Sequence, residues 1–85
     1  MLIVDEPSIG IDIKTKAYLH QLLRDLSDTG TAILLITSDM PEMITLADRI
    51  AVMDDFRIRG EVPNSRRYGE MSAAIMDLIH RAEAA

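Results

Sequence analysis

The feature that most constrains this chain is a short aliphatic run that ends in two adjacent acids. Residues 2–7 read LIVDEP, and an apolar segment of this length, bounded by acids and a proline, is typical of a buried parallel strand. In open α/β sheets, ligands bind beyond the carboxyl ends of the strands. The run therefore predicts that Asp5 and Glu6 stand at a ligand crevice. The plainer alternative is a strand that runs into an acidic surface turn.

Two carboxylates at such a strand end suit nucleotide hydrolysis. That reaction needs one acid to hold Mg²⁺, often through water, and a second to orient or deprotonate the attacking water. Asp5 and Glu6 are of the right type and in the right place for these two tasks. The sequence that follows them decides between this hypothesis and the surface turn.

Apolar residues further along the chain alternate between helical and extended patterns, which predicts an α/β fold. Residues 32–37 show no alternation of apolar and polar residues, as expected for a strand that is covered on both faces. Two short strands are expected downstream, at residues 50–53 and 57–62. Apolar stripes with helical spacing predict three helices, at residues 14–28, 40–47 and 71–82.

Composition excludes several classes of function. A chain of 85 residues makes at most one small domain, and its net charge of −5 argues against a general role in nucleic-acid binding. The absence of cysteine excludes disulfides and thiolate catalysis. The longest apolar stretch, residues 32–36, is far too short to span a bilayer. Any membrane association is therefore expected to come through a partner rather than by direct insertion.

Three further segments follow the LIVDEP run in a characteristic order: SIGID at residues 8–12, TSD at 37–39 with MPE directly after it, and LADRIAVM at 46–53. In order and spacing, the series closely resembles the C-terminal part of an ATP-binding-cassette (ABC) transporter ATPase subunit. Residues 2–7 resemble its Walker B motif, residues 8–12 its D-loop and residues 37–39 its switch loop. The resemblance covers nearly the whole chain, to about Glu61, and the tail more loosely.

The switch position points to one branch of this family. Most members carry a histidine there, whereas this chain carries Ser38, followed by an acid, Met and Pro-Glu. This pattern is similar to the second cassette of bacterial monosaccharide importers of the ribose, galactose and xylose type. A serine hydroxyl can hydrogen-bond a phosphate, but it cannot become cationic as histidine can.

The resemblance implies a role for each site residue. Asp5 would bind Mg²⁺, and Glu6 would be the base that polarises water for attack on the γ-phosphate of ATP. Ser38 would contact that phosphate, with a simple helix-start residue as the alternative. Asp12 would act in the D-loop, where the family couples two cassettes. Asp12 is also a suitable N-cap for the helix that follows, and both readings can hold.

The sequence also lacks two motifs of the resembled family. No G-x-x-x-x-G-K-[ST] phosphate loop is present, and the signature loop rich in Ser and Gly is missing. The resemblance therefore implies a C-terminal fragment of a P-loop NTPase fold, with a mostly parallel sheet, flanking helices and no phosphate-loop strand. Residues 1–62 would be the C-terminal half of an ABC ATPase domain, and residues 63–85 a linker and an amphipathic helix.

The missing strand has a structural implication. In the resembled family it lies between the strands that match residues 32–36 and 50–53, so we expect the chain alone to be marginally folded or prone to association. Phe56 also departs from the pattern, because many members carry Gly in that turn. This departure argues against a tight hairpin between residues 50–53 and 57–62.

The function that the resemblance implies is ATP hydrolysis by a carbohydrate importer, with ATP and Mg²⁺ as cofactors. Its partners would be a second cassette and membrane permease subunits, which would hold it at the cytoplasmic face of the plasma membrane. Two alternatives stay open. One is an inactive remnant that interacts with an intact cassette, and the other is an ABC-type ATPase that is not linked to sugar transport.

Overall fold

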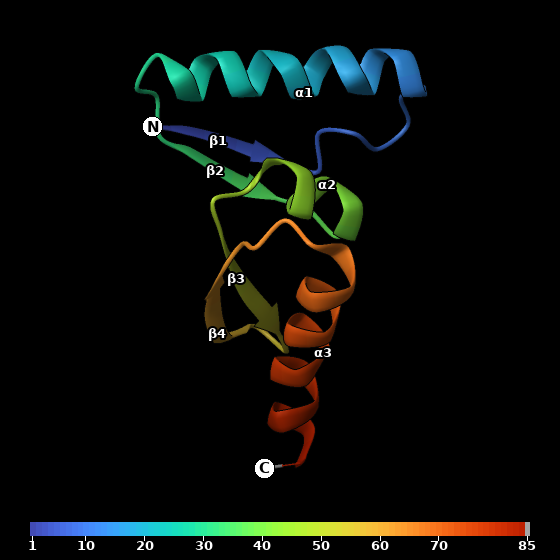
Figure 1. Ribbon diagram of the computed structural model, residues 1–85, viewed down its shortest axis with the longest axis vertical. Coiled ribbons are helices and arrows are strands. Elements are labelled where there is room, and N and C mark those ends of the chain that lie inside the picture. The colour runs from blue at the N-terminus through green and yellow to red at the C-terminus, as the bar shows by residue number, and fades with distance from the viewer. Residues whose placement is uncertain (85) are drawn as a thin grey trace. The chain divides into compact units, whose positions relative to one another are not determined.

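The helices and strands follow the order that the sequence predicts (Figure 1). The computed structural model describes residues 1–84, and the side chains of residues 1–80. Within that part of the chain the elements are β1 (Leu2–Asp5), α1 (Ile13–Asp28), β2 (Ile33–Ile36), α2 (Met40–Leu46), β3 (Arg49–Asp54), β4 (Arg57–Pro63) and α3 (Tyr68–Ala84). The expected α/β composition is confirmed.

The strands form two separate two-stranded sheets among residues 1–84. β1 and β2 pair in parallel, whereas β3 and β4 pair antiparallel. The structure thus differs from the expected mostly parallel sheet. A parallel sheet grows only if each new strand finds a neighbour that runs in the same direction, and in the described chain β2 has only β1.

The chain divides into two compact units, residues 1–39 and residues 40–85. The first unit contains β1, α1 and β2, with α1 lying along one side of the strand pair (Figure 1). The ladder runs in register from Leu2 opposite Ile33 to Asp5 opposite Ile36. α1 ends where the sequence predicts, because Gly30 has a φ of +99°, a left-handed conformation that glycine adopts without strain.

The strands of this first unit are more exposed than their sequence predicts. Leu34 and Ile36 are 48% and 45% exposed, and Ile3 on β1 is 59% exposed. The expectation of buried strands, with residues 32–37 covered on both faces, is therefore wrong for this structure. Side chains alternate between the two faces of a sheet. The first unit contains one helix, which can cover only one of these two faces.

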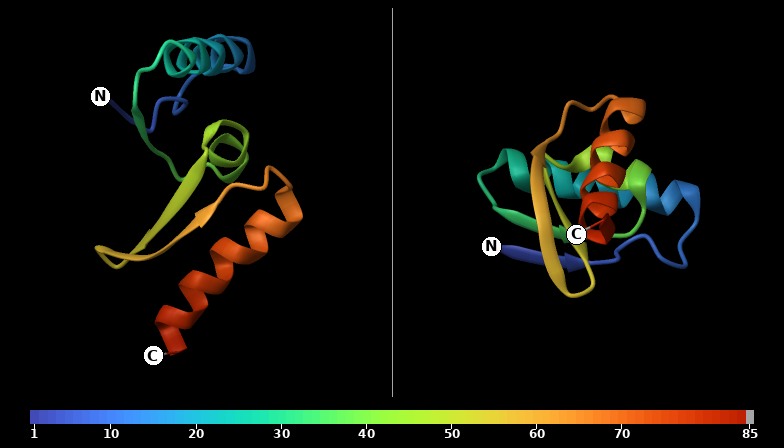
Figure 2. Two further views of the ribbon diagram at one scale, coloured as in Figure 1. Left: turned by 60° about the vertical axis from the view of Figure 1, so that its left-hand side comes forward. Right: turned by 90° about the horizontal axis from the view of Figure 1, so that it is seen from below.

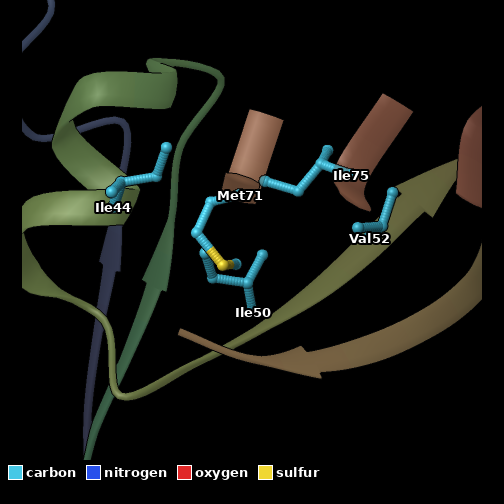
Figure 3. Close-up of a cluster of buried hydrophobic side chains, with 5 residues drawn as sticks. All are labelled: Ile44, Ile50, Val52, Met71 and Ile75. Carbon is cyan, nitrogen blue, oxygen red and sulfur yellow. The ribbon is translucent and has the colours of Figure 1, made fainter. Parts of the chain in front are cut away.

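The second unit holds most of the buried side chains. β3 and β4 form a hairpin, and α3 runs along it (Figure 2). Five buried side chains from α2, β3 and α3 gather into one core, in which Met71 reaches toward Ile50 (Figure 3). They are Ile44, Ile50, Val52, Met71 and Ile75. The helix expected in residues 63–85 is thus present as α3, while the assignment of residues 1–62 to half of an ATPase domain stays a prediction.

The hairpin of this unit is tight, contrary to the expectation from Phe56. Asp55 and Phe56 alone connect β3 to β4, with φ angles of +51° and +61°. Two consecutive positive φ angles are the mark of a type I′ turn, whose twist matches that of the flanking strands. Phe56 thus adopts a left-handed conformation that glycine or asparagine usually occupies in such turns, and its side chain is 96% exposed.

Candidate functional site

The carboxyl ends of β1 and β2 bring the predicted site residues to one edge of the first unit. Asp5 is the last residue of β1 and lies opposite Ile36, the last residue of β2. Glu6 directly follows the first strand, and Ser38 comes two residues after the second. Because the two strands are parallel and in register, these residues leave the sheet at the same edge.

Glu6 has an unusual backbone conformation at this edge. Its φ is +47°, a left-handed value that raises the energy of a non-glycine residue by roughly 1–2 kcal/mol. Two hydrogen bonds hold it there: its N–H donates to the carbonyl of Ile36 at 2.7 Å, and its own carbonyl accepts from the N–H of Ile9 at 3.3 Å. The half-buried Glu6 side chain therefore leaves the strand in a direction set by the backbone.

Asp5 and Glu6 differ in their access to solvent. Asp5 is exposed, whereas Glu6 is half-buried. Among the described residues, no group of three or more histidine or acidic side chains is arranged to hold a metal ion. Mg²⁺ usually keeps several waters and takes only one or two carboxylates, so an exposed Asp5 carboxylate fits that mode of binding.

Asp12 is the N-cap of α1, which confirms one of its two predicted roles. Its Oδ1 accepts a hydrogen bond from the N–H of Thr15 at 2.7 Å. The Thr15 backbone N–H, followed by the Thr15 side chain, lowers the pKa of Asp12 from 3.8. These hydrogen bonds therefore favour the ionised form of the carboxylate. A role in coupling two cassettes stays a prediction.

Ser38 lies in a short turn whose neighbouring residues are held by hydrogen bonds. The N–H of Asp39 donates to Oγ1 of Thr37 at 3.0 Å, while the side chain of Ser38 is exposed. A hydrogen bond that spans Ser38 in this way fixes the backbone on both sides of it. The hydroxyl group is therefore accessible from solvent at the strand edge.

Sequence reasoning missed one contact near this edge. Nζ of Lys16, in the first turns of α1, lies 2.8 Å from Oδ2 of Asp39. The two residues are 23 positions apart, so no periodic pattern connects them. Two sequence features could have indicated this contact: the acid next to Ser38, and the lysine near the start of a helix, where a positive charge is unfavourable.

Comparison with known proteins finds relatives of this chain among the ATP-binding proteins of bacterial sugar importers. It is 49% identical over 76 residues to the ribose import ATP-binding protein RbsA 2 of Streptomyces avermitilis. The match covers 87% of this chain and 15% of that protein. It is 44% identical over 66 residues to the arabinose import ATP-binding protein AraG of Ralstonia nicotianae, covering 78% of this chain and 13% of that protein. The chain thus spans about one seventh of the length of these relatives.

No family model matches the chain. No solved structure matches it either. Within the part of the chain that the structure describes, none of the helices has the length and apolar character needed to cross a bilayer. The relatives with 44–49% identity nevertheless settle the ancestry that the motif series predicted: this chain is homologous to a segment of the ATP-binding proteins of bacterial sugar importers.

Proposed function

We propose that this chain provides the part of a sugar-importer ATPase that activates water and helps to bind Mg²⁺. The observation that carries the proposal is the 49% identity with a ribose import ATP-binding protein over 87% of the chain. The arrangement of Asp5, Glu6 and Ser38 at one strand edge supports it, because nucleotide hydrolysis needs such groups close together.

In this proposal the two acids have separate tasks. Asp5 holds Mg²⁺, directly or through water, and bound Mg²⁺ supplies positive charge to the phosphate oxygens of ATP. Glu6 accepts a proton from, or orients, the attacking water. Its half-buried side chain and hydrogen-bonded backbone suit this task, since a base must be held in a fixed direction.

Ser38 and Asp12 complete the proposed site. The exposed hydroxyl of Ser38 donates a hydrogen bond to the γ-phosphate. Asp12, at the end of the 8–12 loop, contributes to the contact with a second cassette while it caps α1. Permease subunits in the membrane are the remaining partners, and through them the protein acts at the cytoplasmic face of the plasma membrane.

A chimaera tests this function. The 76-residue segment of the Streptomyces protein that matches this chain is replaced by the corresponding residues of this chain, and Mg²⁺-dependent ATPase activity is measured. We expect turnover in the chimaera, and a fall in kcat of about 100-fold or more with Glu6→Gln, because that change removes water activation. ATP affinity should stay the same, since Glu6 makes no phosphate contact in this proposal.

Glu70→Gln is the matched control for this experiment. Glu70 lies in the first turn of α3 and pairs at 3.6 Å with the exposed Arg67, so the same chemical change there should leave kcat unaltered. Full turnover by the Glu6→Gln chimaera would overturn the assignment of Glu6. A chimaera without activity, although it binds ATP, would overturn the proposal that this segment is catalytic.

The exposed strand face favours a second candidate function, that of a non-catalytic partner for an intact cassette. Ile3, Leu34 and Ile36 expose about half of their surface, and such apolar surface is typical of contact sites. This candidate predicts that the chain forms a complex with the Streptomyces protein in sedimentation experiments and that Leu34→Thr weakens it. The control is Ile13→Thr, because Ile13 is 87% exposed and lies on α1 instead of the strand face.

A further inference from the structure

The contact between Lys16 and Asp39 joins two segments that flank the proposed site. Lys16 belongs to the first turns of α1, which follows the 8–12 loop, and Asp39 directly follows Ser38. Their side chains are 31% and 32% exposed and approach to 2.8 Å. A distance this short is that of a charge-assisted hydrogen bond.

The stability of α1 does not explain a lysine at this position. The N-terminus of a helix carries partial positive charge, so a cation in the first turns is unfavourable. The first turn of α1 contains no acid, and the carboxylate of the N-cap Asp12 is engaged by the N–H of Thr15. The carboxylate of Asp39, 23 residues away, compensates the charge of Lys16.

The ion pair between Lys16 and Asp39 also holds the turn that contains Ser38. On one side of Ser38, the carbonyl of Ile36 accepts a hydrogen bond from the N–H of Glu6. On the other side, Asp39 donates its N–H to Thr37 and receives Nζ of Lys16 on its carboxylate. The backbone around Ser38 is thus anchored to β1 and to α1, while its hydroxyl stays exposed.

We propose that Lys16 and Asp39 are positioning residues, whose ion pair fixes the 37–39 turn so that the Ser38 hydroxyl stands at the strand edge beside Asp5 and Glu6. This inference rests on the proposed function for its catalytic consequence. An ion pair that is one-third exposed contributes little to overall stability. Its loss should therefore change the position of Ser38 much more than it changes the melting temperature.

The first test uses the chain itself. Nuclear magnetic resonance follows the amide signals of Ser38 and Asp39 in Lys16→Met and Asp39→Asn, with Lys14→Met as the control. Lys14 is an exposed lysine of the same helix turn. Asp39→Asn removes the charge but keeps the shape and the ability to cap a helix. We expect Lys16→Met and Asp39→Asn to shift both signals and to speed amide exchange at Ser38, and Lys14→Met to leave them in place.

The second test places the same variants in the chimaera. We expect Lys16→Met and Asp39→Asn to lower kcat by about tenfold to 100-fold, because misplacing a contact group by about an ångström has effects of that size. KM for ATP should stay within about twofold of its original value. The double variant Lys16→Asp with Asp39→Lys, which reverses the ion pair, should recover part of the lost kcat. Lys16→Asp alone and Asp39→Lys alone should not recover it.

The outcomes separate this inference from the proposed function. If the signals of Ser38 and Asp39 do not move, or if signals shift throughout the chain, the positioning role is wrong, whether or not the chimaera is active. If those two signals move but kcat does not change in a chimaera that depends on Glu6, the catalytic consequence is wrong. A chimaera that turns over ATP without any dependence on Glu6 contradicts the proposed function and leaves the result from the amide signals standing.

Discussion

The side-chain amide of Asn64 lies 2.8 Å from the main-chain oxygen of Ile44 and closes the C-terminal end of α2. The same Nδ2 donates to the carbonyl of Ala47 at 2.7 Å, and Oδ1 of Asn64 accepts from the N–H of Arg66 at 2.9 Å. The last carbonyls of a helix have no partner within the helix. One half-buried asparagine after the hairpin therefore satisfies two carbonyls near that end of α2 and orders the segment that leads into α3.

Asn64→Ala should lower the free energy of unfolding by about 1–3 kcal/mol, because it leaves partly buried carbonyls without donors. Urea denaturation followed by circular dichroism measures this change. Asn64→Asp should be at least as damaging, since it preserves shape but removes both N–H donors. Ser72→Ala, which removes a hydroxyl that donates to the carbonyl of Gly69 within α3, is the control and should change stability by less than about 0.5 kcal/mol.

Gly60→Ala should destabilise the second unit. A Cβ at Gly60 would lie 2.7 Å from Cδ2 of Leu78 and 3.2 Å from its Cδ1, so β4 and α3 would have to separate or Leu78 would have to change rotamer. Overpacking of this kind lowers stability by about 1–3 kcal/mol. The melting temperature of the variant measures this loss.

A second glycine supplies the control for that experiment. A Cβ at Gly69 meets nothing within 4 Å, and Gly69 lies in α3. Gly69→Ala should therefore raise stability, by up to about 1 kcal/mol, through its higher helix propensity. Leu78→Ala combined with Gly60→Ala should lose less than the sum of the two single changes. Full additivity would contradict the close approach of Gly60 to Leu78.

Asp12 should make the stability of the first unit depend on pH. Its pKa is lower in the folded chain than the ordinary 3.8, because the N–H of Thr15 donates to the ionised carboxylate. The ionised form therefore stabilises the folded chain at pH values above about 4, and this contribution is lost as the pH falls through the folded value. Wild type should be more stable than Asp12→Asn at pH 7, and this advantage should disappear at pH values well below 3.8.

An asparagine at the same helix position separates charge from capping, because it caps a helix about as well as aspartate but does not titrate. Asp28→Asn, at the C-terminal end of the same helix, is the matched control. Loss of a negative charge there should slightly stabilise α1 at pH 7, the opposite direction from Asp12→Asn. Thermal unfolding at several pH values measures both. An advantage of wild type over Asp12→Asn that stays constant down to the lowest pH would contradict the role of the charge.

The 85-residue chain by itself should neither bind nor hydrolyse ATP to a measurable degree. Asp5 and Glu6 act only on phosphates that are already held, and the sequence contains no glycine-rich phosphate loop with its lysine. Isothermal calorimetry with Mg²⁺-ATP should give no heat of binding at micromolar protein. Micromolar affinity, or Mg²⁺-dependent turnover that Glu6→Gln abolishes, would show that these acids work without such a loop.

Local patterns predicted the elements of this chain well. Helical spacing located all three helices, Asp12 marked the start of α1, and the aliphatic runs located β1 and β2. The position of Asp5 and Glu6 at the carboxyl end of a strand also followed from the sequence. These features depend on residues that are close in sequence or on a general rule of strand direction.

What the sequence did not reveal depends on distant partners. Lys16 pairs with Asp39 across 23 positions, and Asn64 reaches Ile44 across 20. The exposure of Leu34 and Ile36 depends on how many layers cover the sheet, which the composition of the strand does not specify. The turn at Phe56 shows a further limit, since its φ of +61° is one that sequence rules assign to glycine or asparagine.

The parallel pairing of β1 with β2 has a consequence for the order of events during folding. Leu2 pairs with Ile33, so β1 can pair with β2 only after the whole of α1 has been synthesised. β3 and β4, by contrast, are separated only by Asp55 and Phe56 and can form contacts at once. Because contacts between distant residues carry a larger loop-closure entropy and form more slowly, we expect the hairpin to become protected first in pulse-labelling hydrogen exchange. The strand that ends at Asp5 therefore acquires its partner late.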